Sequence, residues 1–183
     1  MRVATALALA LHALIMMAVP AAAQKTPPPV IAILDVQRII RDSTAATGIR
    51  SELEKHRSSY QTEITKQEND LRTADQELAQ QRNVLSSEAF AERQREFQKR
   101  VASLGELVQK RKRQLDDAHA VAMKKVEDTL MTIVDELMKE SSFNVVLPKS
   151  TVVRSAGNLE VTDEALKRLN KRLSAVQVVL PKE

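Results

Sequence analysis

The residue types that most often carry chemistry are sparse in this sequence and stand apart from one another. Cysteine is absent, and only His56 and His119 lie beyond the apolar N-terminal segment, each without a second histidine nearby. Metal sites need several ligands at short spacing, so lone histidines are more typical of solvated helix positions. Acidic residues alternate with basic ones, and no glycine-rich phosphate loop or nucleophile motif occurs. The pattern predicts a protein that is not an enzyme and has no cofactor or metal.

Lys110-Arg111-Lys112-Arg113 is the densest group of positive charge in the sequence. Four consecutive residues of a helix point in different directions, and we expect Arg111 to lie between helices. Aromatic residues make up 2% of the chain, too few for stacking on nucleic-acid bases. We therefore expect no nucleic-acid partner, and a mildly basic surface that attracts acidic ligands at a salt-dependent rate.

Residues 1–23 have the pattern of a signal peptide. A positive start at Arg2 precedes an apolar run over residues 3–19, and Ala21-Ala22-Ala23 supplies the small residues of a cleavage site. The run barely reaches the roughly 20 residues of a spanning helix, which favours removal over a retained anchor. An exported chain without cysteine must obtain its stability from packing or assembly.

Proline and glycine divide the remaining chain. Prolines at 27–29 make residues 24–29 an extended leader, and the next proline is Pro148. Between them only Gly48 and Gly105 interrupt a sequence rich in strong helix formers. This composition predicts long helices over residues 44–140.

Heptad spacing indicates that the helices of residues 44–140 pair with each other. Two rows fill the first helix: Arg57, Ile64, Leu71, Leu78 and Leu85; and Leu53, Tyr60, Gln67, Ala74 and Gln81. Residues 83–87 break the helix, and Ser86 can cap the next one. The chain is therefore expected to turn back as a long antiparallel coiled-coil hairpin arm with its tip near residues 83–87.

In the returning helix the apolar spacing changes partway along. The rows expected to face the first helix are Phe90, Phe97 and Leu104; and Val101, Val108, Leu115 and Ala122. Beyond Ala118 the spacing shifts to Met123, Val126, Leu130, Ile133 and Leu137. Such a stutter implies that this end of the helix packs against something other than its hairpin partner.

Residues 30–43 and 141–183 are predicted to form a small α+β body, so the fold class is mainly α with a small β body. Strands are expected at 30–34, 143–147 and 151–154, the last two joined by a turn at 148–150, and Thr162 is expected to cap a final helix. So small a sheet is marginal in water and has open edges, which predicts a body closed by strands from several subunits. The expected oligomerisation residues are Val30, Ile31, Ile33, Leu34, Phe143, Val145, Val146, Leu147, Val152 and Val153. The apolar segment 176–180 has no predicted place.

Two segments carry a resemblance to a known family. Residues 30–40 (VIAILDVQRII) and residues 159–169 (LEVTDEALKRL) are similar to the opening and closing segments of the Skp (OmpH-like) periplasmic chaperones, with Glu160 where aspartate is usual. The resemblance implies a homotrimer in which strands form a central trimerisation core and three arms enclose a cavity. It also implies an ATP-independent holdase that binds unfolded outer-membrane β-barrel proteins in the periplasm. Contact with lipopolysaccharide is implied for some members, but no defined lipid-binding motif matches here. Attraction to another anionic lipid is permitted by the mildly basic charge alone.

The arm offers candidate positions for contact with an unfolded client. These are Val84, Leu85, Phe90, Phe97 and Val101. Because Phe90 and Phe97 fall on the seam, simple packing between the helices is the competing interpretation. Gly105 lies inside a helix, where it is either a hinge or a tolerated substitution. The alternative function for the whole chain is a structural coiled-coil adaptor of the envelope.

Overall fold

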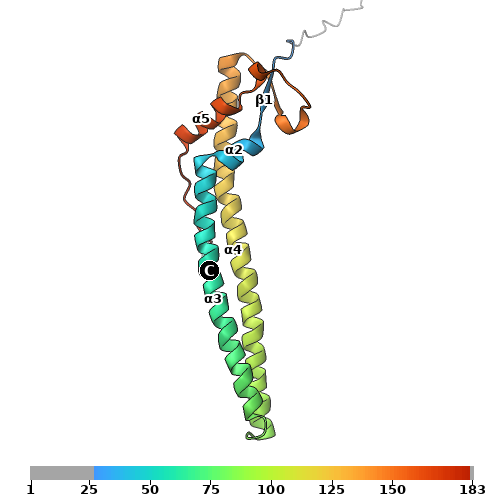
Figure 1. Cartoon of the computed structure of the whole chain (residues 1–183), viewed down its shortest axis with the longest axis vertical. Coiled ribbons are helices and arrows are strands. Elements are labelled where there is room, and N and C mark those ends of the chain that lie inside the picture. Colours follow the sequence, from blue (N-terminus) through green and yellow to red (C-terminus); the bar gives the residue numbers. More distant parts are fainter. Residues whose placement is uncertain (1–26, 182–183) are drawn as a thin grey trace, which may run out of the picture.

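The computed structural model describes residues 27–181, so the predicted signal peptide lies outside the described residues. Figure 1 shows two long helices, side by side and opposite in direction, that extend from a small body at one end. The elements in chain order are β1 (Ile31–Leu34), α2 (Val36–Asp42), α3 (Thr44–Gln81), α4 (Ser87–Ser141), β2 (Val145–Pro148), the 3₁₀ turns η1 (Lys149–Thr151) and η2 (Gly157–Leu159), and α5 (Thr162–Arg172).

Serine caps set where the two long helices begin. The Ser43 side chain accepts a hydrogen bond from the backbone N–H of Ala46 at the start of α3. Ser86 accepts one from the backbone N–H of Ala89 at the start of α4, which confirms the predicted cap. Each cap satisfies a backbone donor that has no partner inside its helix.

The sheet of the body differs from the prediction. β1 and β2 pair in parallel, with Ile31 opposite Val145 and Leu34 opposite Pro148. On its other side β1 forms an isolated parallel bridge between Ile33 and Glu160. β1 is therefore the central strand, and among the described residues β2 pairs with β1 alone.

The predicted strand over residues 151–154, and the hairpin that it would form with the strand before it, are wrong. Pro148 has no backbone N–H to continue a ladder, and its carbonyl accepts a hydrogen bond from the Thr151 hydroxyl at 2.9 Å. The chain turns there into η1, so Val152 and Val153 lie outside any strand. Val153 is fully exposed, with a relative exposure of 105%.

The hydrophobic core fills the body and the adjoining half of the arm. The α4 residues of the shifted spacing are all buried, which confirms that this end of α4 packs against more than α3. They are Met123, Val126, Leu130, Ile133 and Leu137. Leu169 of α5 and Leu34 of β1 join the same cluster. Farther from the body, the facing side chains of α3 and α4 are only half-buried.

Two arginines tie α5 to α4. Arg168 donates to both carboxylate oxygens of Glu140 at 2.9 and 2.7 Å, and Arg172 does the same to Glu136 at 2.9 and 2.8 Å. These hydrogen bonds hold the pKa of the Glu140 and Glu136 carboxyls below their ordinary values. Glu164, which accepts from Arg168, has a lowered pKa for the same reason.

Acid is expected to weaken the docking of α5. Because these carboxyl pKa values are lower in the folded than in the unfolded chain, their stabilisation is complete above the ordinary value of 4.5 and is lost as the pH falls through the folded values. In Glu136→Gln/Glu140→Gln the melting temperature should therefore change less between about pH 5 and about pH 3 than in the parent. Thermal unfolding followed by circular dichroism measures this.

The matched control is Glu68→Gln/Glu92→Gln, which removes two exposed carboxylates from the arm. It should keep the parent's pH dependence. Parallel curves for the parent and the Glu136/Glu140 variant would contradict a role for these ion pairs.

Candidate functional site

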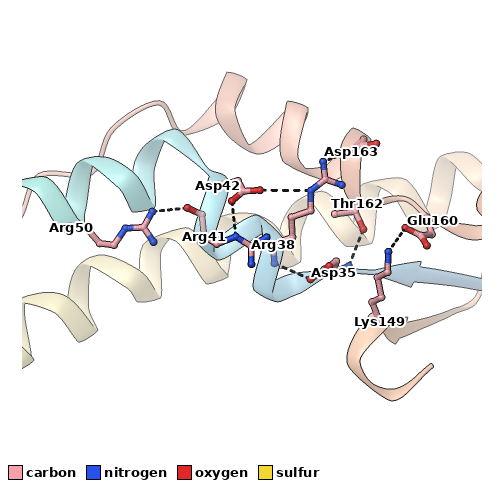
Figure 2. A network of polar contacts seen from close by, with 9 residues as sticks. All are labelled: Asp35, Arg38, Arg41, Asp42, Arg50, Lys149, Glu160, Thr162 and Asp163. Atoms are coloured by element: carbon pink, nitrogen blue, oxygen red, sulfur yellow. Dashed lines mark hydrogen bonds and ion pairs between the residues drawn. The ribbon is translucent and has the colours of Figure 1, made fainter. Parts of the chain in front are cut away.

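The two segments that resemble the chaperone family meet in the body, where Asp35 contacts Thr162, 127 residues later in the sequence. The backbone N–H of Asp35 donates to the Thr162 hydroxyl at 2.9 Å (Figure 2). The Asp35 carboxylate caps α2 by accepting from the backbone N–H of Arg38 at 2.9 Å. The Arg38 guanidinium then lies 2.8 Å from the Asp163 carboxylate. Through these contacts the opening segment of the body is joined to its closing segment.

Thr162 does not have the role expected from sequence. It is the first residue of α5, whose N-cap is Val161, and its side chain makes no capping bond within that helix. Its hydroxyl is buried and directed at Asp35 instead. The adjoining backbone is held as well, since the Val161 N–H donates to the Ile33 carbonyl at 2.9 Å.

The residues of the body make structural contacts. Glu160, which stands where the family usually has aspartate, accepts a hydrogen bond from Lys149 at 3.0 Å (Figure 2).

The two histidines of the described chain lie on the long helices, His56 half-buried on α3 and His119 exposed on α4. Within residues 27–181, His, Cys, Asp and Glu form no group of three or more that could hold a metal ion.

The candidate oligomerisation residues divide into two groups. Ile33, Leu34 and Phe143 are buried inside the chain's own fold, with relative exposures of 2%, 2% and 7%. The others remain at least partly accessible: Val30, Ile31, Val145, Val146, Leu147, Val152 and Val153. Most of the accessible group lies on β2, the strand whose second edge is unpaired in the described chain, and in the loop after it; Val30 and Ile31 lie at the start of β1.

A polar cluster lies where the dense core gives way to the outer arm. Arg111 donates to both carboxylate oxygens of Glu63 at 3.2 Å and to Gln114 at 3.0 Å. Its guanidinium lies 4.4 Å from the centre of the Tyr60 ring, a cation–π distance. With 16% of its side chain exposed, Arg111 lies between the helices as predicted.

The outer arm places the five candidate client-contact residues in two settings. Leu85, Phe90 and Phe97 are half-buried, while Val84 and Val101 are 82% and 45% exposed. The two phenylalanines thus contribute to contact between the helices and still expose part of their surface. The two valines have most or nearly half of their surface available to another molecule.

The predicted facing row that contains Val101 and Val108 is wrong in its outer half. Both valines are exposed, at 45% and 36%, whereas Leu104, Leu107 and Arg111 are half-buried. At this level of the arm Leu107, three residues after Leu104, is therefore more buried than Val101, three residues before it. Both offsets fit a heptad, so spacing alone did not distinguish them.

Open clefts accompany this incomplete burial. One of about 220 Å³ is lined by residues of both helices, including Leu78 and Phe97. A second of about 340 Å³ is lined by Leu71, Lys99 and Ser103 among others. These clefts are open to solvent. It is the half-burial of the facing side chains, in contrast to the buried ones beside the body, that marks the outer arm as loosely packed.

Gly105 lies beside this loosely packed region within the continuous helix α4. A Cβ atom built there would have nothing within 4 Å, so no close contact requires glycine. The glycine therefore weakens the helix without a packing reason, by about 1 kcal/mol relative to alanine.

Gly105→Ala is expected to stabilise α4 by about 1 kcal/mol and to slow hydrogen exchange across residues 100–110. Exchange followed by mass spectrometry measures this locally. Gly48→Ala in α3 is the matched control, because a Cβ there also meets nothing within 4 Å. Uniform protection of residues 100–110, unchanged by Gly105→Ala, would contradict a hinge.

The fold consists of a small strand-containing body and a long pair of packed helices, and its class is mainly α with a small β body. The family model described as outer membrane protein (OmpH-like) matches residues 30–169. The chain belongs to that family, and the resemblance noted in its opening and closing segments is confirmed.

The structure is similar to a protein from Caulobacter crescentus CB15 whose crystal structure is described as that of an outer membrane chaperone (OmpH-like). The TM-score is 0.78 at 15% sequence identity, and the match covers 86% of this chain and 94% of that one. At this identity the likeness is one of fold. A search of curated proteins found no match. None of the helices in residues 27–181 has the length and apolarity needed to cross a membrane.

Proposed function

We propose that this protein is an ATP-independent holdase chaperone of the periplasm, which binds unfolded outer-membrane β-barrel proteins and prevents their aggregation. The observation that carries the proposal is the packing of the arm: dense beside the body, loose beyond Arg111, with Val84 and Val101 exposed. Unfolded clients differ in sequence, so a holdase needs many weak and adaptable contacts. Membership of the OmpH-like family supports this class of client.

The proposed working form is a homotrimer whose arms surround the client. The unpaired edge of β2 and the exposed Val153 beside it supply the surface for assembly, because an open strand edge invites pairing with another chain. The number three comes from the family resemblance. Light scattering over a range of concentrations tests the assembly, and a stable monomer at all of them would contradict it.

The chaperone activity is tested by diluting a urea-unfolded outer-membrane protein into buffer with and without the purified chain. Suppressed turbidity without ATP is the expected result. Unchanged aggregation in the presence of a correctly assembled protein would overturn the proposal and favour the structural adaptor.

The outer arm is tested with a matched pair of valines. Val101→Glu adds a charge to the outer part of α4, and Val121→Glu adds the same charge to an exposed site nearer the body, where the parent valine is 61% exposed. We expect Val101→Glu to weaken client binding by about fivefold to tenfold, the scale of losing one apolar contact. Val121→Glu should leave binding close to the parent value. If the two substitutions changed client binding equally, the outer arm would not be the contact surface for clients.

A further inference from the structure

The segment after α5, which had no predicted place, lies against the arm. This tail (residues 174–181) runs back from α5 along α3 (Figure 1). Its exposure alternates: Val176 and Val178 are 7% and 6% exposed, whereas Gln177 and Val179 are exposed. Burial of every second side chain is the pattern of an extended strand on an apolar surface.

Side chains of the arm hold this tail by its backbone. The N–H of Val178 donates to the Glu52 carboxylate of α3 at 3.3 Å. The carbonyl of Pro181 accepts from the Gln114 amide of α4 at 3.1 Å. Every residue type offers the same backbone carbonyl, and nearly every type the same N–H. These two contacts therefore favour an extended backbone and do not depend on which side chains the bound segment carries.

Gln114 is oriented for this role by contacts inside the arm. It is 8% exposed, and its amide oxygen accepts hydrogen bonds from the Tyr60 hydroxyl at 3.3 Å and from Arg111 at 3.0 Å. Both partners are donors, which directs the oxygen at them and the amide N–H at the tail. The side of the arm next to the body therefore carries a side-chain N–H that is directed at a backbone carbonyl of the tail.

We propose that the arm surface beneath the tail, beside Glu52 and Gln114 and here called the groove, is a binding site for extended segments with apolar side chains at alternate positions. The tail occupies the groove in the free protein, and a strand of an unfolded client displaces the tail. The identity of the client rests on the proposed chaperone function. Strands of membrane β-barrels alternate apolar and polar side chains. They could therefore offer an apolar side chain at every second position, as the tail does with the buried Val176 and Val178. The tail then lowers the affinity for clients by the fraction of time that it fills the groove.

Releasing the tail is the first test. Val176→Ser/Val178→Ser removes the two buried anchors in the full chain, and Val179→Ser makes the same change at a 64% exposed neighbour. If the tail fills the groove for about nine-tenths of the time, its release should tighten binding of an unfolded outer-membrane protein about tenfold. The Val179→Ser control should bind as the parent does. Circular dichroism checks that both variants are folded.

Locking the tail is the opposite test. The chain has no cysteine of its own, so Glu52→Cys/Val179→Cys places a unique pair of thiols on the groove and the tail. After cross-linking with a short bismaleimide, client binding should become weaker than in the same variant before cross-linking. The two single-cysteine variants treated with the same reagent control for modification alone.

A peptide separates this inference from the chaperone proposal. A fluorescein-labelled peptide with the sequence of residues 174–181 should bind the released variant in anisotropy measurements and should not bind the locked one. Absence of peptide binding to the released variant would overturn the inference, whatever the client experiments give. So would client affinities that are the same in the released, locked and parent proteins. If the peptide binds but no client does, the groove is a binding site for extended segments, and the proposed chaperone function is overturned. Displacement of the tail by a client is then overturned as well.

Discussion

Replacing Leu130 with alanine is expected to lower the free energy of unfolding by about 2–5 kcal/mol. Leu130 lies on α4 with 1% of its surface exposed, within the cluster that also contains residues of β1, α2 and α5. Its truncation removes buried apolar surface and leaves a cavity that the surrounding elements cannot fully close. Urea unfolding followed by circular dichroism measures the loss.

The matched control is Leu78→Ala, the same change at a half-buried position of the outer arm. It should cost less than about half as much, because less surface is buried there and an open cleft already adjoins it. Both variants must be compared at one protein concentration, since assembly adds to stability. Equal losses would contradict the division of the arm into a dense and a loose part.

Thr162→Val is expected to cost about 1–3 kcal/mol, although it preserves the shape of the side chain. The Thr162 hydroxyl is the acceptor for the backbone N–H of Asp35, and Thr162 is 2% exposed. Valine would leave that donor without a partner in a part-buried setting, and an unmet buried donor costs its full desolvation penalty. The melting temperature and the urea midpoint should both fall.

Thr62→Val controls for the exchange of hydroxyl for methyl. Thr62 is exposed on α3 and its hydroxyl donates to the Ser58 carbonyl within the same helix. Its replacement should change stability by less than about 0.5 kcal/mol. If Thr162→Val were equally mild, the junction of the two family segments would not depend on this hydrogen bond.

Together these contrasts assign different physical tasks to the two halves of the arm. Beside the body, Leu130 and its neighbours fix α4 in place, and the Asp35–Thr162 contact joins the two ends of the body. Beyond Arg111 the helices hold together through half-buried side chains, with clefts between them. A firm base with a pliable outer arm suits the proposed holdase, because the arm can adapt while the body stays assembled.

Features that depend on neighbours in sequence could be predicted without the structure. The Ser86 cap, the position of Arg111 between the helices and the shifted spacing beyond Ala118 all follow from helical periodicity and local hydrogen bonding. The two segments that resemble the family could be recognised from sequence because specific contacts require particular residue types in them. They include residues, such as Asp35 and Thr162, whose side chains have specific partners in the body.

Features that depend on a distant partner required the folded chain. Spacing could not choose between the two heptad offsets that expose or bury Val101, and an apolar run at 151–154 has the composition of a strand without a strand beside it. Thr162 can cap a helix or accept from Asp35, and only the approach of β1 decides for the second. The position of the tail likewise depends on hydrogen bonds with Glu52 and Gln114, which are far from it in sequence. Local periodicity specifies which elements form, whereas the energy of burying a given side chain depends on which surface arrives opposite it.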